Sequence, residues 1–225
     1  MFYLLALLLR LFFLQKQENI NEYKKSKLLG VNMSSYFKYL TLFLLSVLGL
    51  YLTFVSVTGL FFISIYLENR PLWSLLLDYA DNIDRLSSLS YITSVLLSLF
   101  WIYKAHKNIE QKGIKNLNFS NKACVYWWFV PILSLWKPYY IVKEIFLASK
   151  FANDWKDKSA LFLIIWWWLF LISILLSKIV RELPEPSLEL VSSSIIVEFI
   201  LSILYIKIIY SVYKFQNRIS LTKAI

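Results

Sequence analysis

Few side chains in this chain of 225 residues are of the types that carry out acid–base, nucleophilic or metal chemistry. His106 is its one histidine and Cys124 its one cysteine, which is too few for a metal site or for a haem held by two histidines of one chain. No Ser-His-Asp set stands at a recognisable spacing, and four glycines leave no phosphate-binding loop. We therefore expect no catalytic residue, no metal site and no cofactor, although a homo-oligomer could pair two copies of His106 around a haem.

Glu198 is the one acidic residue that falls inside a long apolar stretch, where an ionisable group is a candidate functional site. Its spacing places it on one helix face with other polar residues, and we expect this face to turn toward the other helices. Those residues are Ser194, Ser202 and Tyr205. Two interpretations remain open. Glu198 could be a protonatable site for a solute or ion, or a neutral, hydrogen-bonded acid that fixes the register of the helix.

A second carboxylate, Glu144, lies among apolar neighbours at helical spacing and therefore needs a polar partner. Lys137, seven residues earlier and on nearly the same side of a helix, is one candidate, and a group on another helix is the other. A contact with His106 would let protonation tune the local packing, since both residues are expected at one depth. In the simpler interpretation, His106, Asn108 and Lys137 hydrogen-bond an interrupted backbone near Pro131 and hold it in place.

The elements that must position these groups are predicted to be membrane-spanning helices. The composition is 59% hydrophobic and 17% charged, whereas soluble domains contain about 25% charged residues. The hydrophobic content excludes a disordered chain, and a single cysteine excludes a disulfide scaffold. Four stretches are long and apolar enough to cross a hydrocarbon core of about 30 Å, which predicts an all-α integral membrane protein. They cover residues 39–67, 86–103, 160–176 and 190–210.

The distribution of lysine and arginine predicts how the spans are oriented. The net charge is +10, and most of the cations fall in residues 1–38, 104–158 and 207–225. The two remaining connections, 68–85 and 178–189, hold more acidic than basic residues. Since cation-rich loops stay on the cytoplasmic side, both termini are expected to be cytoplasmic. The membrane accounts for the basic and aromatic residues, so nucleic acid is not an expected partner.

The first 36 residues are expected to lie outside the four-helix domain, which covers residues 37–225. Residues Met1–Leu14 are apolar apart from Arg10 and favour an interfacial helix, and a polar, lysine-rich tether follows. The segment lacks a basic start and a small-residue cleavage site, so we do not expect a signal peptide. A start at Met33 is the alternative interpretation.

One aromatic stretch between the second and third spans does not fit a span. Residues Ala123–Trp136 read A-C-V-Y-W-W-F-V-P-I-L-S-L-W, which is too short to cross a bilayer and is interrupted by Pro131. A full crossing would also invert the charge pattern. We therefore expect a re-entrant or interfacial element on the cytoplasmic side, with Trp127, Trp128 and Trp136 at headgroup depth.

A helix is predicted to follow this aromatic stretch. Pro138 suits the first turn of a helix, and apolar residues recur at helical spacing from there to Phe151. The whole non-spanning element therefore covers about residues 123–151, and Glu144 lies within it.

Four sequence blocks occur in order from the second span through this element. They are W-I-Y-K-A-H-K-N (Trp101–Asn108), W-W-F-V-P (Trp127–Pro131), L-W-K-P-Y (Leu135–Tyr139) and E-I-F-L-A-S (Glu144–Ser149). These blocks resemble a bacterial family of small four-helix integral membrane proteins that is catalogued as a domain of unknown function. Ser134 stands where an Asn is common in that family, and the first 32 residues are additional. The resemblance implies a multi-pass protein of the bacterial inner (plasma) membrane, and it brings no established activity.

The function expected from these observations is non-catalytic binding of a lipid headgroup or a partner protein by the aromatic element. The candidate contact residues are Trp127, Trp128, Trp136, Lys137, Tyr139 and Glu144. The residues expected to support them are Trp101, Tyr103, His106, Asn108, Pro131 and Pro138. The expected partners are the bilayer itself and either a second membrane protein or another copy of the chain. The alternative function is a small transporter or channel for a solute or ion that uses Glu198.

Overall fold

The computed structural model describes residues 33–222, which form helices joined by turns and loops and contain no β-strand. The interfacial helix and tether predicted for residues 1–36 fall almost entirely outside the described residues. Leu40 begins the larger of the chain's two units, and every contact described below lies within that unit.

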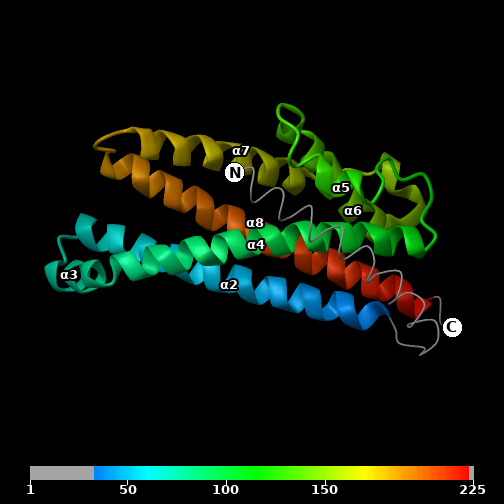
Figure 1. Cartoon of the computed structure of the whole chain (residues 1–225), viewed down its shortest axis with the longest axis horizontal. Helices are drawn as coiled ribbons and strands as arrows, with labels where there is room; N and C mark the ends of the chain where they lie inside the picture. The colour runs from blue at the N-terminus through cyan, green and yellow to red at the C-terminus, as the bar shows by residue number, and fades with distance from the viewer. Residues whose placement is uncertain (1–32, 223–225) are drawn as a thin grey trace. The chain divides into compact units, whose positions relative to one another are not determined.

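Four helices are long and apolar enough to cross a membrane, as the hydropathy of the sequence predicts. They are α2 (Met33–Tyr66), α4 (Ala80–Gln111), α7 (Leu161–Glu182) and α8 (Leu188–Thr222), and Figure 1 shows them as the long ribbons of the structure. The described residues therefore fit a multi-pass membrane protein. Within this set, α7 packs along α8, and α8 also contacts α4.

The helices extend further than the predicted spans, and α4 shows why this matters. The apolar pattern ends near residue 103, but α4 continues to Gln111 through charged and polar residues that remain good helix formers. Its 32 residues correspond to about 48 Å at 1.5 Å per residue. This length exceeds a hydrocarbon core of about 30 Å, so the last turns of α4 can support structure outside the hydrocarbon.

The connection between α2 and α4 holds a short helix, α3 (Arg70–Asp78), that the sequence analysis treated as a loop. Asn69 caps it, since its side-chain oxygen accepts a hydrogen bond from the backbone N–H of Leu72 at 3.3 Å. Pro71 occupies the first turn, where its missing N–H is not needed.

The non-spanning element lies between α4 and α7 and consists of four short helices. They are α5 (Ala123–Tyr126), the 3₁₀ turn η1 (Leu133–Leu135), α6 (Lys137–Phe151) and the 3₁₀ helix η2 (Ala152–Asp157). The helix predicted from Pro138 to Phe151 is confirmed as α6, which begins one residue earlier. As Figure 1 shows, α6 packs against α4, α7 and α8.

Candidate functional site

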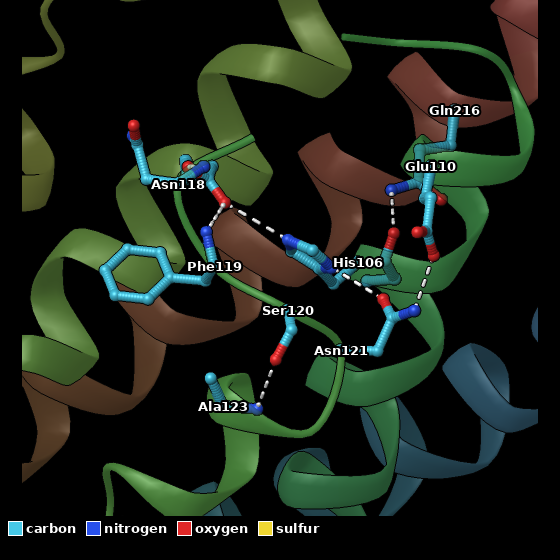
Figure 2. A network of polar contacts seen from close by, with 10 residues as sticks. His106, Glu110, Asn118, Phe119, Ser120, Asn121, Ala123 and Gln216 are labelled. Carbon is cyan, nitrogen blue, oxygen red and sulfur yellow. Dashed lines mark hydrogen bonds and ion pairs between the residues drawn. The ribbon is translucent and has the colours of Figure 1, made fainter. Parts of the chain in front are cut away.

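The centre of the candidate site is a contact between His106 of α4 and Glu144 of α6. The Nε2 atom of His106 lies 3.1 Å from Oε1 of Glu144, and both side chains are 1% exposed. Of the partners considered for Glu144 from the sequence, the structure therefore selects His106, and Lys137 is not its partner. Figure 2 shows the polar network around this histidine.

The second nitrogen of His106 contacts the side-chain oxygen of Asn121. His106 Nδ1 lies 2.6 Å from Asn121 Oδ1, and Asn121 Nδ2 donates to Oε2 of Glu110 at 2.5 Å (Figure 2). A carboxylate only accepts hydrogen bonds, so the contact with Glu110 fixes which end of the Asn121 amide faces the histidine. The amide oxygen faces His106, and Nδ1 must therefore carry the proton.

Glu144 also holds the loop of residues 112–122 to α6. Its Oε2 accepts from the backbone N–H of Asn118 at 2.7 Å, and its Oε1 accepts from that of Phe119 at 3.4 Å. Gly113 and Asn116 have positive φ angles of 78° and 62°, which suit Gly and Asn and turn the loop back over the helices. Two backbone donors thus converge on one carboxylate.

A second part of the network joins the C-terminal region of α8 to α4 and α6. Gln216 is buried, and its Nε2 donates to the backbone oxygen of Ala105 and to Ser149 Oγ, each at 3.0 Å. Its Oε1 accepts from Asn108 Nδ2 at 3.2 Å, and Lys112 Nζ contacts its backbone oxygen. Sequence analysis missed Gln216, for which the only signal was an uncharged polar residue among apolar positions of the helix.

The simpler interpretation of His106, Asn108 and Lys137 is therefore wrong. None of the three bonds the backbone around Pro131 in the part of the chain that the structure describes, because their partners are those given above and, for Lys137, two aromatic rings. The region near Pro131 is closed by its own backbone instead. The N–H of Leu133 donates to the oxygen of Pro131 at 2.7 Å, which makes a γ-turn centred on Ile132.

The ammonium group of Lys137 lies over two aromatic rings at the start of α6. Its Nζ is 5.5 Å from the ring centroid of Trp127 and 5.8 Å from that of Phe119, both within the range of a cation–π contact. Phe119 comes from the loop that Glu144 holds. Neither ion pair found among residues 33–222 involves Lys137, which is half-buried.

The aromatic element rests on the tryptophans of α7. The ring of Trp128 meets that of Trp167 edge-on at 6.4 Å, and Tyr139 lies 6.5 Å from the same ring. Trp167 Nε1 donates to the backbone oxygen of Leu135 at 2.9 Å. The indole Nε1 of Trp128 is buried and has no partner among the described residues. These contacts attach the aromatic stretch and the start of α6 to Trp167 of α7.

The remaining predicted residues lie around this centre rather than in it. Trp101 is buried in α4 and donates from Nε1 to Thr41 Oγ1 at 3.0 Å. Tyr103 is half-buried, Pro138 is buried, and both Pro131 and Trp136 are exposed. The structure therefore brings His106 and Glu144 together, and it places Lys137 beside them through Phe119.

Glu198 occupies a separate position where four helices meet. Its Oε2 accepts from the hydroxyl of Tyr51 on α2 at 3.3 Å, and its Oε1 accepts from that of Ser177 on α7 at 3.4 Å. Tyr91 of α4 packs on Tyr51 with ring centroids 5.6 Å apart. Ser202, on the same face, is buried, so the prediction that this face turns toward the other helices is confirmed.

The comparisons with known proteins give a family for the region that holds His106, Glu144 and Glu198. No group of three potential metal ligands occurs among the described residues, and no curated protein and no solved structure matches the chain. Residues 79–206 match a family described as a domain of unknown function (DUF4328). This region includes α4, the aromatic element, α6, α7 and most of α8, and it is more than half of the chain. The chain therefore belongs to the DUF4328 family.

Proposed function

We propose that the protein is a non-catalytic membrane module that binds the headgroup of an anionic lipid at its aromatic element, with Lys137 as the charged contact. The observation that supports this most directly is the placement of the Lys137 ammonium over Trp127 and Phe119 without a carboxylate partner among residues 33–222. A half-buried cation that the protein leaves without a counter-ion is stabilised by an anion from its surroundings.

The contacts with α7 support headgroup depth for this cation. Trp166, Trp167 and Trp168 follow one another near the start of α7, and tryptophan is enriched where a span meets the headgroups. Trp128 and Tyr139 pack on Trp167, so Lys137 would lie near the same level. Anionic lipids attract lysine at this level.

The exposed apolar residues around Pro131 support the same arrangement. Phe129, Ile132 and Leu135 are all more than 40% exposed beside the attachment to Trp167. Such a cluster would be costly in water and suits the acyl region next to α7. In this proposal the element enters the cytoplasmic leaflet as a shallow re-entrant segment.

Glu144 and His106 would serve this site by positioning it, because a side chain that is 1% exposed cannot reach a headgroup. They hold the loop that brings Phe119 over Lys137. Trp136 and Tyr139, which retain exposed surface at the start of α6, are the further candidates for contact with lipid.

The test is native mass spectrometry of the protein after reconstitution with equal amounts of phosphatidylglycerol and phosphatidylcholine. Lys137→Glu should reduce the retained phosphatidylglycerol about tenfold, since one charge-assisted contact is worth about 1.5–3 kcal/mol. Lys137→Arg should retain it. Lys115→Glu changes an exposed lysine of the neighbouring loop by the same charge and should have little effect. Equal loss in both Glu variants, or retention by Lys137→Glu, would count against the site.

The proposal includes the location and partners of the protein. We place it in the bacterial plasma membrane, with both termini in the cytoplasm and the bilayer as the first partner. A mass increment that corresponds to a second membrane protein or another copy of the chain, rather than to lipid, would assign the aromatic element to protein binding.

Transport of a small solute or ion is the second candidate function, and one observation favours it. Hydroxyl groups from α2 and α7 converge on the Glu198 carboxylate inside the span regions, where an ionisable group is often functional. Flux measured in proteoliposomes should fall to background in Glu198→Gln and persist in Glu189→Gln, an exposed carboxylate at the start of α8. If the protein carries neither protons nor monovalent cations, the transport proposal fails and Glu198 has a structural role.

A further inference from the structure

We propose that His106 is a doubly protonated imidazolium in the folded protein, and that its charge locks the loop of residues 112–122 onto α6. The locked loop would keep Phe119 in place as one wall of the Lys137 site. Only this last step depends on the proposed lipid function, since the ionisation of His106 follows from the network itself.

Both ring nitrogens of His106 face oxygen atoms that accept hydrogen bonds. Asn121 presents its amide oxygen to Nδ1, because its amide nitrogen is committed to Glu110. Glu144 presents Oε1 to Nε2. A neutral imidazole donates from one nitrogen only, so its other nitrogen would oppose an acceptor lone pair. Two donors satisfy both contacts, and an imidazolium has two.

The alternative is a neutral histidine beside a protonated Glu144. The geometry disfavours it because Glu144 also accepts from the backbone N–H groups of Asn118 and Phe119. In that alternative Glu144 would donate its own hydrogen to the bare Nε2 and would accept the two amide bonds as a neutral acid. An ionised carboxylate accepts such bonds about twice as strongly, so the two backbone donors favour the pair of imidazolium and carboxylate.

The charges around His106 agree with a positive ring. Burial disfavours the charged ring, whereas the hydrogen bonds to Glu144 and Asn121 and the negative charges of Glu144 on α6 and Glu110 on α4 favour it. On α5, burial raises the pKa of the Cys124 thiol, so it remains neutral. Gln216, which bonds the backbone of α4 from α8, is uncharged. One imidazolium therefore stands between two carboxylates.

The proton on Nε2 of His106 determines whether the negative charge of Glu144 is balanced by a positive one. When it is lost, a buried carboxylate faces the lone pair of a neutral ring, and an unpaired buried charge is strongly destabilising. The loop can relieve this cost by releasing Asn118 and Phe119, so that water reaches Glu144. Loop order is thus present while His106 is charged and Glu144 ionised. It is lost as pH rises through the titration of His106.

The consequence for the Lys137 site is a change in its wall. Phe119 lies over Lys137 and belongs to the segment that Glu144 holds through its backbone. Release of that segment would leave only Trp127 over the ammonium group. Binding of an anionic headgroup would then depend on the proton of a residue that the headgroup never touches.

The test uses the fact that His106 is the only histidine of the chain. The full chain, prepared without a histidine tag and labelled with ¹⁵N-histidine, is placed in nanodiscs that contain phosphatidylglycerol and phosphatidylcholine. Near neutral pH, both ring nitrogens should give the signals of protonated imidazolium. A ring with one protonated and one bare nitrogen at that pH would overturn the proposal.

Hydrogen exchange at the amides of Asn118 and Phe119 tests the lock itself. Glu144→Gln should leave His106 neutral and reduce the protection of both amides about tenfold, which is the expected loss of charge-assisted bonds. Glu182→Gln, an exposed carboxylate near the end of α7, should change neither signal. Protection that stays unchanged in Glu144→Gln would overturn the lock.

A pH titration of the unmodified chain provides the same test if Glu144→Gln fails to fold. The protection factors of the two amides should fall together with the loss of the imidazolium signal, and independence of the two would overturn the lock. Lys137→Glu separates this inference from the proposed function. If Lys137→Glu loses the bound lipid while His106 stays charged, the lipid proposal and the lock are both supported. If Lys137→Glu retains the lipid, the lipid proposal fails, and the histidine signals and amide protection still test the lock by themselves.

Discussion

A carboxylate as buried as Glu144 is tolerated in a protein only while other groups balance its charge and fill its hydrogen-bonding positions. Here the groups come from two neighbouring elements, since His106 lies on α4 and the two amides lie in the loop after it. The pair therefore contributes to the register between α4 and α6 rather than to stability alone. Either partner without the other would leave a buried group unsatisfied.

The same surroundings make Cys124 unreactive. Its side chain is fully buried, and burial, followed by the nearby negative charge of Glu144, raises the pKa of the thiol. Because the thiolate is the reactive form, we expect the folded protein in nanodiscs to react with a maleimide at least about tenfold more slowly than the protein unfolded in dodecyl sulfate. Intact-mass measurement over time follows the single thiol. A Ser120→Cys variant, at an exposed loop position, should react rapidly, and rapid labelling of Cys124 itself would contradict the burial.

The His106–Glu144 contact could be expected from the sequence, but most of its surroundings could not. Both residues stand in helices whose depth the apolar pattern indicates, so their meeting was one of a few options. Asn121 could not be assigned because loop residues have no periodicity to show where they point. Its contact with Glu110, near the end of α4, could therefore not be predicted either. The placement of Phe119 over Lys137 depends on the path of that loop, in which Gly113 and Asn116 have positive φ angles.

The element that interrupts the membrane pattern contains a strained turn. Ile132 has φ 66° and ψ −55°, and it is 70% exposed. A β-branched residue is rare at positive φ and raises the free energy of the fold by about 1–3 kcal/mol. The turn nevertheless leaves the apolar side chain of Ile132 exposed, where contact with lipid would offset the strain.

Replacement of Ile132 should show this strain directly. Ile132→Gly should raise the thermal unfolding temperature in detergent, because glycine adopts positive φ without a clash and relieves about 1 kcal/mol or more. Ile132→Ala is the matched control, since it removes a similar side chain but keeps the Cβ. A midpoint for the glycine variant that is equal to or below that of the alanine variant would show that the turn is not strained.

The buried amide of Gln216 joins the C-terminal part of α8 to α4 and α6. Gln216→Leu keeps the side-chain size but leaves the oxygen of Ala105 and the hydroxyl of Ser149 without their donor. We expect a loss of about 1–3 kcal/mol in the free energy of unfolding, as for other buried groups left unsatisfied. Denaturant titration in mixed micelles measures it, and Gln111→Leu, at an exposed end of α4, should cost less than about 0.5 kcal/mol. Equal effects would remove Gln216 as an anchor.

At the scale of elements, hydropathy predicted the four long helices, because lipid requires long continuous apolar stretches. It did not predict α3 or the last two turns of α4, which are helical although they are not apolar. Capping by Asn69 and the Pro71 that follows were visible signals for α3. The extension of α4 depends on tertiary packing, since Ile109 is buried by neighbouring elements.

Over the whole molecule, polar residues form two separate clusters, one around Glu198 and one around the His106–Glu144 pair. Glu198 lies within the region that the span helices share, and the His106–Glu144 pair lies where α4 extends beyond its apolar part. The separation matters for experiments, because the lipid and transport proposals depend on different residues. A variant at Glu198 leaves the aromatic element intact, and a variant at Lys137 leaves the span helices intact.

The orientation of the molecule in the membrane decides which side each cluster faces, and the charges of the connections predict it. The segment from α6 to α7 carries Lys150, Lys156 and Lys158, whereas the link from α7 to α8 carries Glu182 and Glu185. The positive-inside rule therefore predicts that the first link is cytoplasmic and that the second lies outside. Because Cys124 is buried, single cysteines added elsewhere can report the two sides with little background.

In intact cells, a membrane-impermeant maleimide should label Glu185→Cys, and it should label Asp157→Cys only after the membrane is permeabilised. The opposite pattern would invert the topology and move the lipid site to the outer leaflet. Labelling of both without permeabilisation would mean that the two links lie on one side, which a single crossing by α7 does not allow.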